Sequence, residues 1–156
     1  EVGAESGTGI VAPTSFTPIE REPEAAAVRT RAIALSMTAG AWLINGTQMN
    51  QISDVPAAIN FRIAPGDVEI WQLTNSSGVS HPIHLHNRHF QILTIDGEPP
   101  PPHLAGWKDT VIVGPQHTVR ILVRFEGTPD DEFPYMFHCH ILEHEDMGMM
   151  GQFFIV

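Results

Sequence analysis

A short segment near the end of the chain gathers residue types that bind transition metals. Cys139, the only cysteine in the chain, lies between His138 and His140. His144 follows five residues after the cysteine and Met149 follows ten residues after it. One thiolate, two imidazoles and a weak axial thioether form the ligand set of blue-copper electron-transfer sites. The spacing therefore predicts a metal site in this segment.

A second segment contributes three more imidazoles, at His81, His84 and His86. Six of the nine histidines therefore lie in two short stretches. A blue-copper site at Cys139 needs a second imidazole beside His144, and His81 is the natural candidate. Zinc also binds cysteine and histidine, but zinc seldom uses a thioether, so the ligand types favour copper over zinc.

The apolar and aromatic residues before Cys139 predict a strand, and the strand separates the ligands into two groups. Successive side chains of a strand point to opposite faces. His138 and His140 therefore share one face, about 6–7 Å apart along the chain, while Cys139 points the other way. The same alternation puts His84 and His86 on one face. The sequence thus predicts a mononuclear site on one face and four imidazoles on the other, connected by Cys139.

The remainder of the chain predicts a succession of short strands. Residues 118–125 alternate between apolar side chains, expected to face inward, and Arg120 and Arg124, expected to face outward. We expect at most one or two turns of helix after His140. Many short strands separated by turn residues predict an all-β fold, a Greek-key β-sandwich or barrel.

Composition limits the domain organisation and the partners. Residues 1–28 are rich in Gly, Ala, Glu and Pro without sustained periodicity, which predicts a linker or interdomain arm followed by one domain over residues 29–156. The net charge of −10 disfavours nucleic acid and anionic membranes as partners. No apolar run approaches the roughly 20 residues of a membrane span. The single cysteine excludes an internal disulfide.

Both histidine segments resemble the copper signatures of the multicopper oxidases. The likeness is strongest to the last cupredoxin domain of bacterial copper-efflux oxidases, laccases and bilirubin oxidases. It covers roughly residues 29–156 and includes, besides the two histidine segments, residues 31–37, 42–46, 64–71 and 103–111. The resemblance implies a cupredoxin-like fold and a periplasmic or secreted enzyme.

The resemblance also implies a role for each ligand. The type 1 copper would be bound by His81, Cys139, His144 and Met149. The type 2 copper would be bound by His84, and the type 3 pair by His86, His138 and His140. Glu145 matches an acidic position that relays protons toward the oxygen site, although it could also be part of a charged surface turn.

The activity implied by the resemblance is that of a copper-dependent, laccase-like oxidase. The type 1 copper accepts electrons from a reducing substrate, which can be a phenol, a bilirubin-like pigment, Cu(I) or Fe(II). The electrons pass through Cys139 to a trinuclear copper site that reduces O2 to water. Residues 75–80 hold no carboxylate of the kind that copper-efflux and laccase-like enzymes place just ahead of the first type 1 histidine, which leaves the reducing substrate open.

Family members complete the trinuclear site with two further His-x-His pairs from their first domain. Outside the two segments this chain has only His89, His103 and His117, which are isolated from one another. We therefore expect a fragment that lacks half of the trinuclear ligands and is inactive alone. Its partner would be an N-terminal cupredoxin domain of the same enzyme or a companion chain, and an oligomeric two-domain laccase stays possible. A free-standing cupredoxin electron carrier is the alternative, although a carrier needs only one copper.

Overall fold

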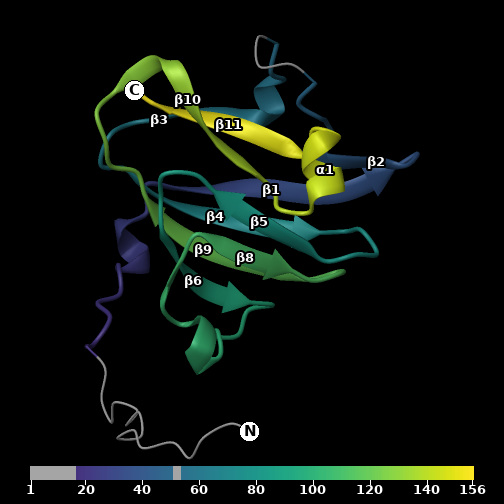
Figure 1. The fold of residues 1–156 in the computed structure, drawn as a ribbon. Helices are drawn as coiled ribbons and strands as arrows, with labels where there is room; N and C mark the ends of the chain where they lie inside the picture. Colours follow the sequence, from purple (N-terminus) through teal and green to yellow (C-terminus); the bar gives the residue numbers. More distant parts are fainter. Residues whose placement is uncertain (1–16, 51–53) are drawn as a thin grey trace, which may run out of the picture.

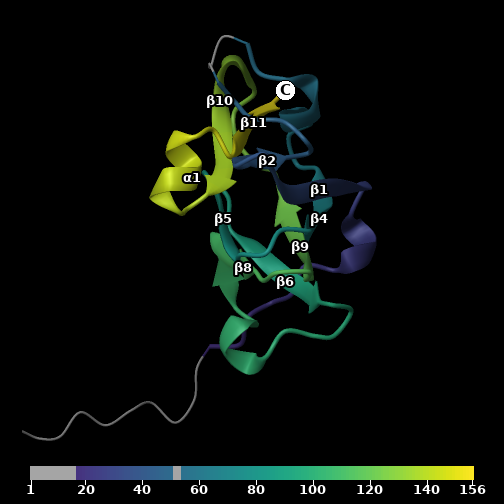
Figure 2. The ribbon, with the colours of Figure 1, turned by 90° about the vertical axis from the view of Figure 1, so that its right-hand side faces the viewer.

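The computed structural model describes residues 17–50 and 54–156, and these residues form two β-sheets packed face to face (Figures 1 and 2). The helical segments are short: η1 Glu24–Ala26, η2 Ala57–Ile59, η3 Pro102–Leu104 and α1 Leu142–Asp146. The strands are β1 Arg29–Thr38, β2 Ala41–Ile44, β3 Asn60–Ile63, β4 Val68–Asn75, β5 His81–Leu85, β6 Phe90–Ile95, β7 Trp107–Lys108, β8 Thr110–Val113, β9 Thr118–Arg124, β10 Asp130–Cys139 and β11 Met150–Ile155. The predicted all-β fold is confirmed, and the short helix α1 agrees with the expectation of at most one or two helical turns after His140.

The first sheet has the strand order β2-β1-β4-β9-β6-β7, and the second has the order β3-β11-β10-β5-β8. Most neighbours are antiparallel, but β1 runs parallel to β4 and β3 runs parallel to β11. In the second sheet, β10 lies between β11 and β5. The two histidine segments are therefore in adjacent strands, with His138 directly opposite His84.

The core between the sheets holds the end of β10 in place. Val119, Ile121, Val123 and Phe125 turn into this core as the alternation predicts, while Leu122 packs in the small cluster on the outer face. Phe137, two residues before Cys139, is fully buried. Its ring centroid lies 5.3 Å from that of Phe61 and 5.1 Å from that of Trp71. Because such close-packed aromatic groups leave little free volume, the strand that carries Cys139 has a rigid support.

The residues just before β1 lie along the outer face of the six-stranded sheet. Arg120 and Arg124 face outward from β9, as predicted, and form ion pairs with Glu24 and Glu22. Beside them, a small apolar cluster on the same face is covered by residues 26–27. Residues 1–16 of the predicted linker lie outside the described residues, and the boundary at residue 29 stays a prediction.

Within the described part of the chain, no helix combines the length and apolar character needed to cross a lipid bilayer.

Candidate metal centre

Three of the predicted ligands converge in the interior of the protein. Cys139 Sγ lies 3.5 Å from His144 Nδ1 and 3.6 Å from His81 Nδ1. All three side chains are buried, and their ligand atoms lie within 4.8 Å of one another. With metal–sulfur and metal–nitrogen bonds of about 2.3 Å and 2.0 Å, tetrahedral geometry places sulfur and nitrogen about 3.5 Å apart. The donor atoms and their spacing therefore fit a single transition-metal ion.

Each of these ligands comes from a different element. His81 begins β5, Cys139 ends β10, and His144 lies in α1. The turn of α1 is closed by a hydrogen bond from His144 N to Ile141 O of 2.9 Å. Met149 N then donates to His144 O, and Cys139 N donates to Met149 O. These backbone bonds close the loop from Cys139 to Met149 around the site.

The predicted axial ligand, Met149, is fully buried in the same core cluster as Cys139. Gly148 lets the chain reach this position. It has a φ of +83°, and a Cβ built there would lie 2.5 Å from the carbonyl oxygen of Met49. The backbones are joined at this point, since Met49 N donates to Gly148 O at 2.9 Å. Only glycine fits both the conformation and the close approach.

The ligand histidines are covered by an aromatic ring that the sequence does not identify as part of the site. The Trp42 ring stacks on His144 with centroids 4.2 Å apart and contacts His81 edge-on at 5.4 Å. Trp42 lies in β2, a strand of the opposite sheet, about a hundred positions from His144 in sequence. No local spacing links the two residues, so only the packing of the sheets reveals the contact.

Burial determines the protonation of the site. Loss of solvation, together with the neighbouring His144, lowers the pKa of His81 from 6.5 to about 4. Burial also lowers the pKa of His144 and raises the pKa of the Cys139 thiol. At neutral pH both imidazoles are therefore neutral and able to bind a metal, while the thiol holds its proton until a metal displaces it.

His81 has a second polar contact that spacing alone does not indicate. Its Nε2 lies 2.8 Å from the hydroxyl oxygen of Ser77, which is buried. Ser77 in turn contacts the side chain of Asn75. Since a metal-ligating imidazole usually directs its other nitrogen to a polar partner, the contact fits a ligand role for His81.

A second group of imidazoles lies on the outer face of the five-stranded sheet. The ligand atoms of His84, His86 and His138 lie within 4.8 Å of one another, and His86 Nε2 is 3.1 Å from His138 Nε2. His140 adjoins this group, with its ring centroid 5.6 Å from those of His84 and His138, but its nitrogens are not among the converging atoms. The two-face arrangement predicted from strand alternation is therefore present.

In two rings of this second group, polar contacts at Nδ1 fix the orientation of the imidazole. His84 Nδ1 faces the backbone oxygen of Asp109 at 3.0 Å and the hydroxyl of Thr110 at 3.1 Å. His138 Nδ1 faces the backbone oxygen of Cys139 at 3.1 Å. An imidazole whose Nδ1–H donates to a carbonyl keeps a lone pair at Nε2. Both rings can therefore present Nε2 to a metal on the outer face.

Glu145, predicted to relay protons, lies beside this group. Its carboxylate oxygen Oε2 is 3.3 Å from His138 Nδ1, and the side chain is about one-third exposed. The carboxylate thus contacts both solvent and an imidazole of the cluster. Such a position suits exchange of protons between water and the histidine face.

Cys139 connects the two groups through one residue of backbone. Its side chain lies in the buried site, while its neighbours His138 and His140 lie on the outer face. The hydrogen bond from His138 Nδ1 to the backbone oxygen of Cys139 adds a second connection. A metal bound at each group would therefore be joined by a short path of covalent and hydrogen bonds.

The other histidines belong to neither group. His117 pairs with the carboxylate of Asp96 at the surface, and His103 lies in η3. His89 borders a surface pocket together with Trp107. None of the three belongs to either cluster of ligand atoms found among the described residues. Their positions in the sequence do not form a His-x-His pair.

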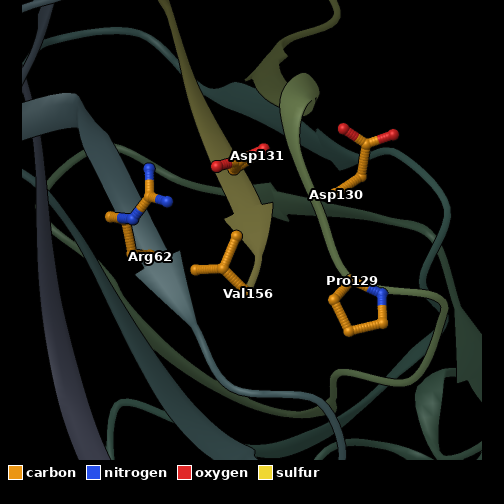
Figure 3. Close-up of a pocket in the computed structure, with 5 residues that line it drawn as sticks. All are labelled: Arg62, Pro129, Asp130, Asp131 and Val156. Carbon is orange, nitrogen blue, oxygen red and sulfur yellow. The ribbon is translucent and has the colours of Figure 1, made fainter.

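A pocket at the opposite end of β10 from Cys139 has a different character. It is lined by Arg62, Pro129, Asp130, Asp131 and Val156, as Figure 3 shows. These side chains carry charged and aliphatic groups but no imidazole or thiol. The pocket therefore offers none of the soft or nitrogen ligands on which the metal assignment depends.

Comparison with known proteins agrees with this geometry. The family model described as multicopper oxidase matches residues 22–156. A multicopper oxidase of Staphylococcus haemolyticus is 41% identical over 113 residues, which are 70% of this chain and 23% of that protein. A laccase of Haloferax volcanii is 52% identical over 93 residues, covering 58% of this chain and 16% of that protein. The chain thus spans less than a quarter of these relatives.

Solved structures give the same result. McoA multicopper oxidase from Aquifex aeolicus superposes with a TM-score of 0.78 and 34% identity, over 89% of this chain and 31% of that chain. The laccase-like multicopper oxidase CueO from Ochrobactrum sp. superposes with a TM-score of 0.79 and 30% identity, over 94% of this chain and 34% of that chain. These neighbours confirm the expected cupredoxin-like fold. The chain belongs to the multicopper oxidase family.

Proposed function

We propose that this chain is the electron-accepting domain of a laccase-like oxidase that reduces O2 to water. The type 1 copper would be held by His81, Cys139, His144 and, as a weak axial ligand, Met149. A copper ion held there would supply one-electron redox chemistry between Cu(II) and Cu(I). The observation that carries this proposal is that Cys139 joins a buried thiol–imidazole site to a separate face of imidazoles. A free electron carrier would need only the buried site.

The outer face would supply part of a trinuclear copper site. His84 would bind the type 2 copper, and His86, His138 and His140 would bind the type 3 pair. Each metal would need further ligands because these four imidazoles, of which only three have converging ligand atoms, leave most coordination positions open. We therefore propose a partner that presents two His-x-His pairs, either an N-terminal cupredoxin domain or a companion chain.

The surface around these imidazoles supports such a partner. Ile112 is 66% exposed and Leu142 is 67% exposed. Ile112 lies in β8, two residues from Thr110, which is opposite His84. Large exposed apolar side chains beside incomplete metal ligands are typical of a surface that a second domain covers. Burying them would also exclude water from the oxygen site.

For the electron donor we propose only a chemical class, a one-electron reductant. The relatives include laccases and a bilirubin oxidase. A phenol, a bilirubin-like pigment, Cu(I) or Fe(II) is each compatible with one-electron transfer to the buried site. We also propose a periplasmic or secreted location, which rests on family resemblance alone.

Glu145 is proposed to deliver protons to the oxygen site, because reduction of O2 to water consumes four protons and its carboxylate contacts His138. In the complete enzyme, Glu145→Gln should slow reoxidation by O2 far more than reduction by substrate. The matched control is Glu143→Gln, since Glu143 is exposed in the same helix. Stopped-flow measurement of both half-reactions tests this, and equal slowing of the two would refute the role.

Copper analysis of this chain alone tests the division of ligands between two partners. After loading and dialysis, the chain should hold about one copper tightly, because incomplete ligand shells bind metals weakly. It should accept an electron from a reductant and show no sustained oxygen uptake at an oxygen electrode. Three or more tightly held coppers, or steady oxygen uptake by the monomer, would contradict the proposal.

A further inference from the structure

The side chains of Asn75, Ser77 and His81 form a buried chain of hydrogen bonds. The orientation of Asn75 determines which group donates at each step of this chain. Asn75, the last residue of β4, is 1% exposed. The two N–H groups of its amide nitrogen face three backbone oxygens, those of Val79, Val113 and Gly114, at 2.8, 3.0 and 3.0 Å, so one N–H is shared between two of them. A flipped amide would set its oxygen against three carbonyls, which can only accept. The amide oxygen of Asn75 must therefore point toward Ser77.

The hydroxyl of Ser77 is oriented next. Its oxygen lies 2.8 Å from Asn75 Oδ1 and 3.1 Å from the backbone oxygen of Val79. Both neighbours are acceptors, and Asn75 Oδ1 also accepts from the backbone N–H of Ser77 at 2.9 Å. A hydroxyl has one proton to donate. Directing that proton to one of these two oxygens avoids setting the lone pairs of Oγ against both of them. One lone pair of Ser77 Oγ accepts from the backbone N–H of Val79 at 3.4 Å, and the other remains for His81.

His81 completes the chain. Its Nε2 lies 2.8 Å from Ser77 Oγ, and both residues are buried. Because the hydroxyl proton is committed elsewhere, Nε2 must carry a hydrogen and donate it to Ser77. A neutral imidazole has only one N–H, so Nδ1 is left as a lone pair. Nδ1 is the atom that faces Cys139 Sγ at 3.6 Å.

We propose that Ser77, oriented by Asn75, is a positioning residue that fixes His81 in the Nε2–H tautomer and so keeps Nδ1 ready for the metal. This inference rests on the proposed type 1 copper site, but the tautomer is a property of the copper-free chain. The hydrogen-bonded chain of Asn75, Ser77 and His81 contains no charged group, so Ser77 differs from a carboxylate partner of a histidine. Without Ser77, a buried Nε2–H would lack an acceptor, and the ring would gain from moving its proton to Nδ1.

The tautomer can be measured without copper. In the 15N-labelled copper-free protein at neutral pH, long-range 1H–15N correlations of the imidazoles should show His81 entirely as the Nε2–H tautomer. In Ser77→Ala the ring should populate the Nδ1–H tautomer as well. Copper affinity, measured by competition with a chelator of known affinity, should fall about 10–100-fold, the usual loss when a ligand's outer partner is removed.

Two further variants separate positioning from a general loss of structure. Ser77→Thr keeps a hydroxyl and should retain both the Nε2–H tautomer and the copper affinity. Ser80→Ala, at an exposed position next to His81, should change neither. If Ser77→Ala does not fold, the parent spectrum and Ser77→Thr still decide the question.

The proposal is overturned if His81 of the parent protein is the Nδ1–H tautomer, or if Ser77→Ala keeps a pure Nε2–H tautomer with full copper affinity. Failure of the parent to bind copper through Cys139 would instead refute the proposed type 1 site, while the copper-free spectra would still report on the tautomer of His81.

Discussion

The indole ring of Trp42 stacks on the imidazole of His144, with ring centroids 4.2 Å apart and an angle of 29° between the planes. Trp42 lies in β2 of the six-stranded sheet and His144 lies in helix α1, so the contact closes the buried site on the side of β2. His144 is only 7% exposed as a result of this packing. The stacked ring therefore both holds the imidazole and restricts the access of water and chelators to it.

Trp42→Ala should weaken copper binding by up to about tenfold, because an aromatic pair contributes about 0.5–1.5 kcal/mol beyond its buried area. It should also speed the removal of copper by a chelator. Trp107→Ala is the control, since Trp107 is 47% exposed and belongs to neither ligand cluster. Unchanged removal kinetics in Trp42→Ala would show that the indole does not protect the site.

Gly148→Ala should destabilise the protein by about 2 kcal/mol or more, because a left-handed conformation costs a non-glycine residue about 1–2 kcal/mol and the new methyl group collides with backbone. Gly97→Ala is the matched control, with a φ of +87° and no atom within 4 Å of the added Cβ. Urea unfolding compares the two. Equal losses of unfolding free energy would mean that the contact with Met49 does not constrain this loop.

The copper-free protein should lose stability as the pH falls from about 6.5 to about 4. The pKa of His81 is 6.5 in an unfolded chain and about 4 in the folded protein, so the unfolded state binds the proton more tightly. Above pH 6.5 the neutral state of His81 costs the folded protein no stability relative to the unfolded chain. As the pH falls toward 4, protonation of the unfolded chain lowers the free energy of unfolding by about 3 kcal/mol. Burial of His144 acts in the same direction.

Urea unfolding at a series of pH values checks this linkage. His81→Gln should flatten the dependence between pH 6.5 and 4, because the variant lacks the group with the lowered pKa. A parent protein whose unfolding free energy stays constant over this window would contradict the buried, neutral state of His81.

Met149→Leu should raise the reduction potential of the copper site. A weak axial thioether stabilises Cu(II) slightly relative to Cu(I), and leucine removes that donor while filling a similar volume. Met147→Leu is the control because Met147 is 43% exposed. Voltammetry of the copper-loaded variants gives the comparison, and a potential that falls or does not change would exclude Met149 as the axial ligand.

Much of the site could be predicted because its ligands lie close together in sequence. Strand alternation around Cys139 was enough to separate the buried thiol from His138 and His140. The same alternation placed His84 and His86 on the outer face. The alternation in residues 118–125 likewise predicted both the core side chains and the outward-facing arginines.

The contacts that cross between elements could not be predicted in this way. Trp42 contacts His144 only because β2 and α1 become neighbours when the sheets pack. No periodic pattern in the sequence shows that these two elements lie close together. Ser77 is four residues from His81, but a serine ahead of a strand is usually a turn residue. Its role depends on the orientation of Asn75, which three backbone oxygens from two separate segments determine.

The most direct test of the proposed function is the visible spectrum of the copper-loaded chain and of its Cys139→Ser variant. A Cu(II)–thiolate bond gives an intense visible charge-transfer band, so the parent should be blue and should bleach on reduction. Cys139→Ser should lose the band while circular dichroism shows the same β-fold. An intense blue band that survives in Cys139→Ser, or its absence from the fully copper-loaded parent, would contradict the assignment of Cys139 as the copper ligand that joins the two sites.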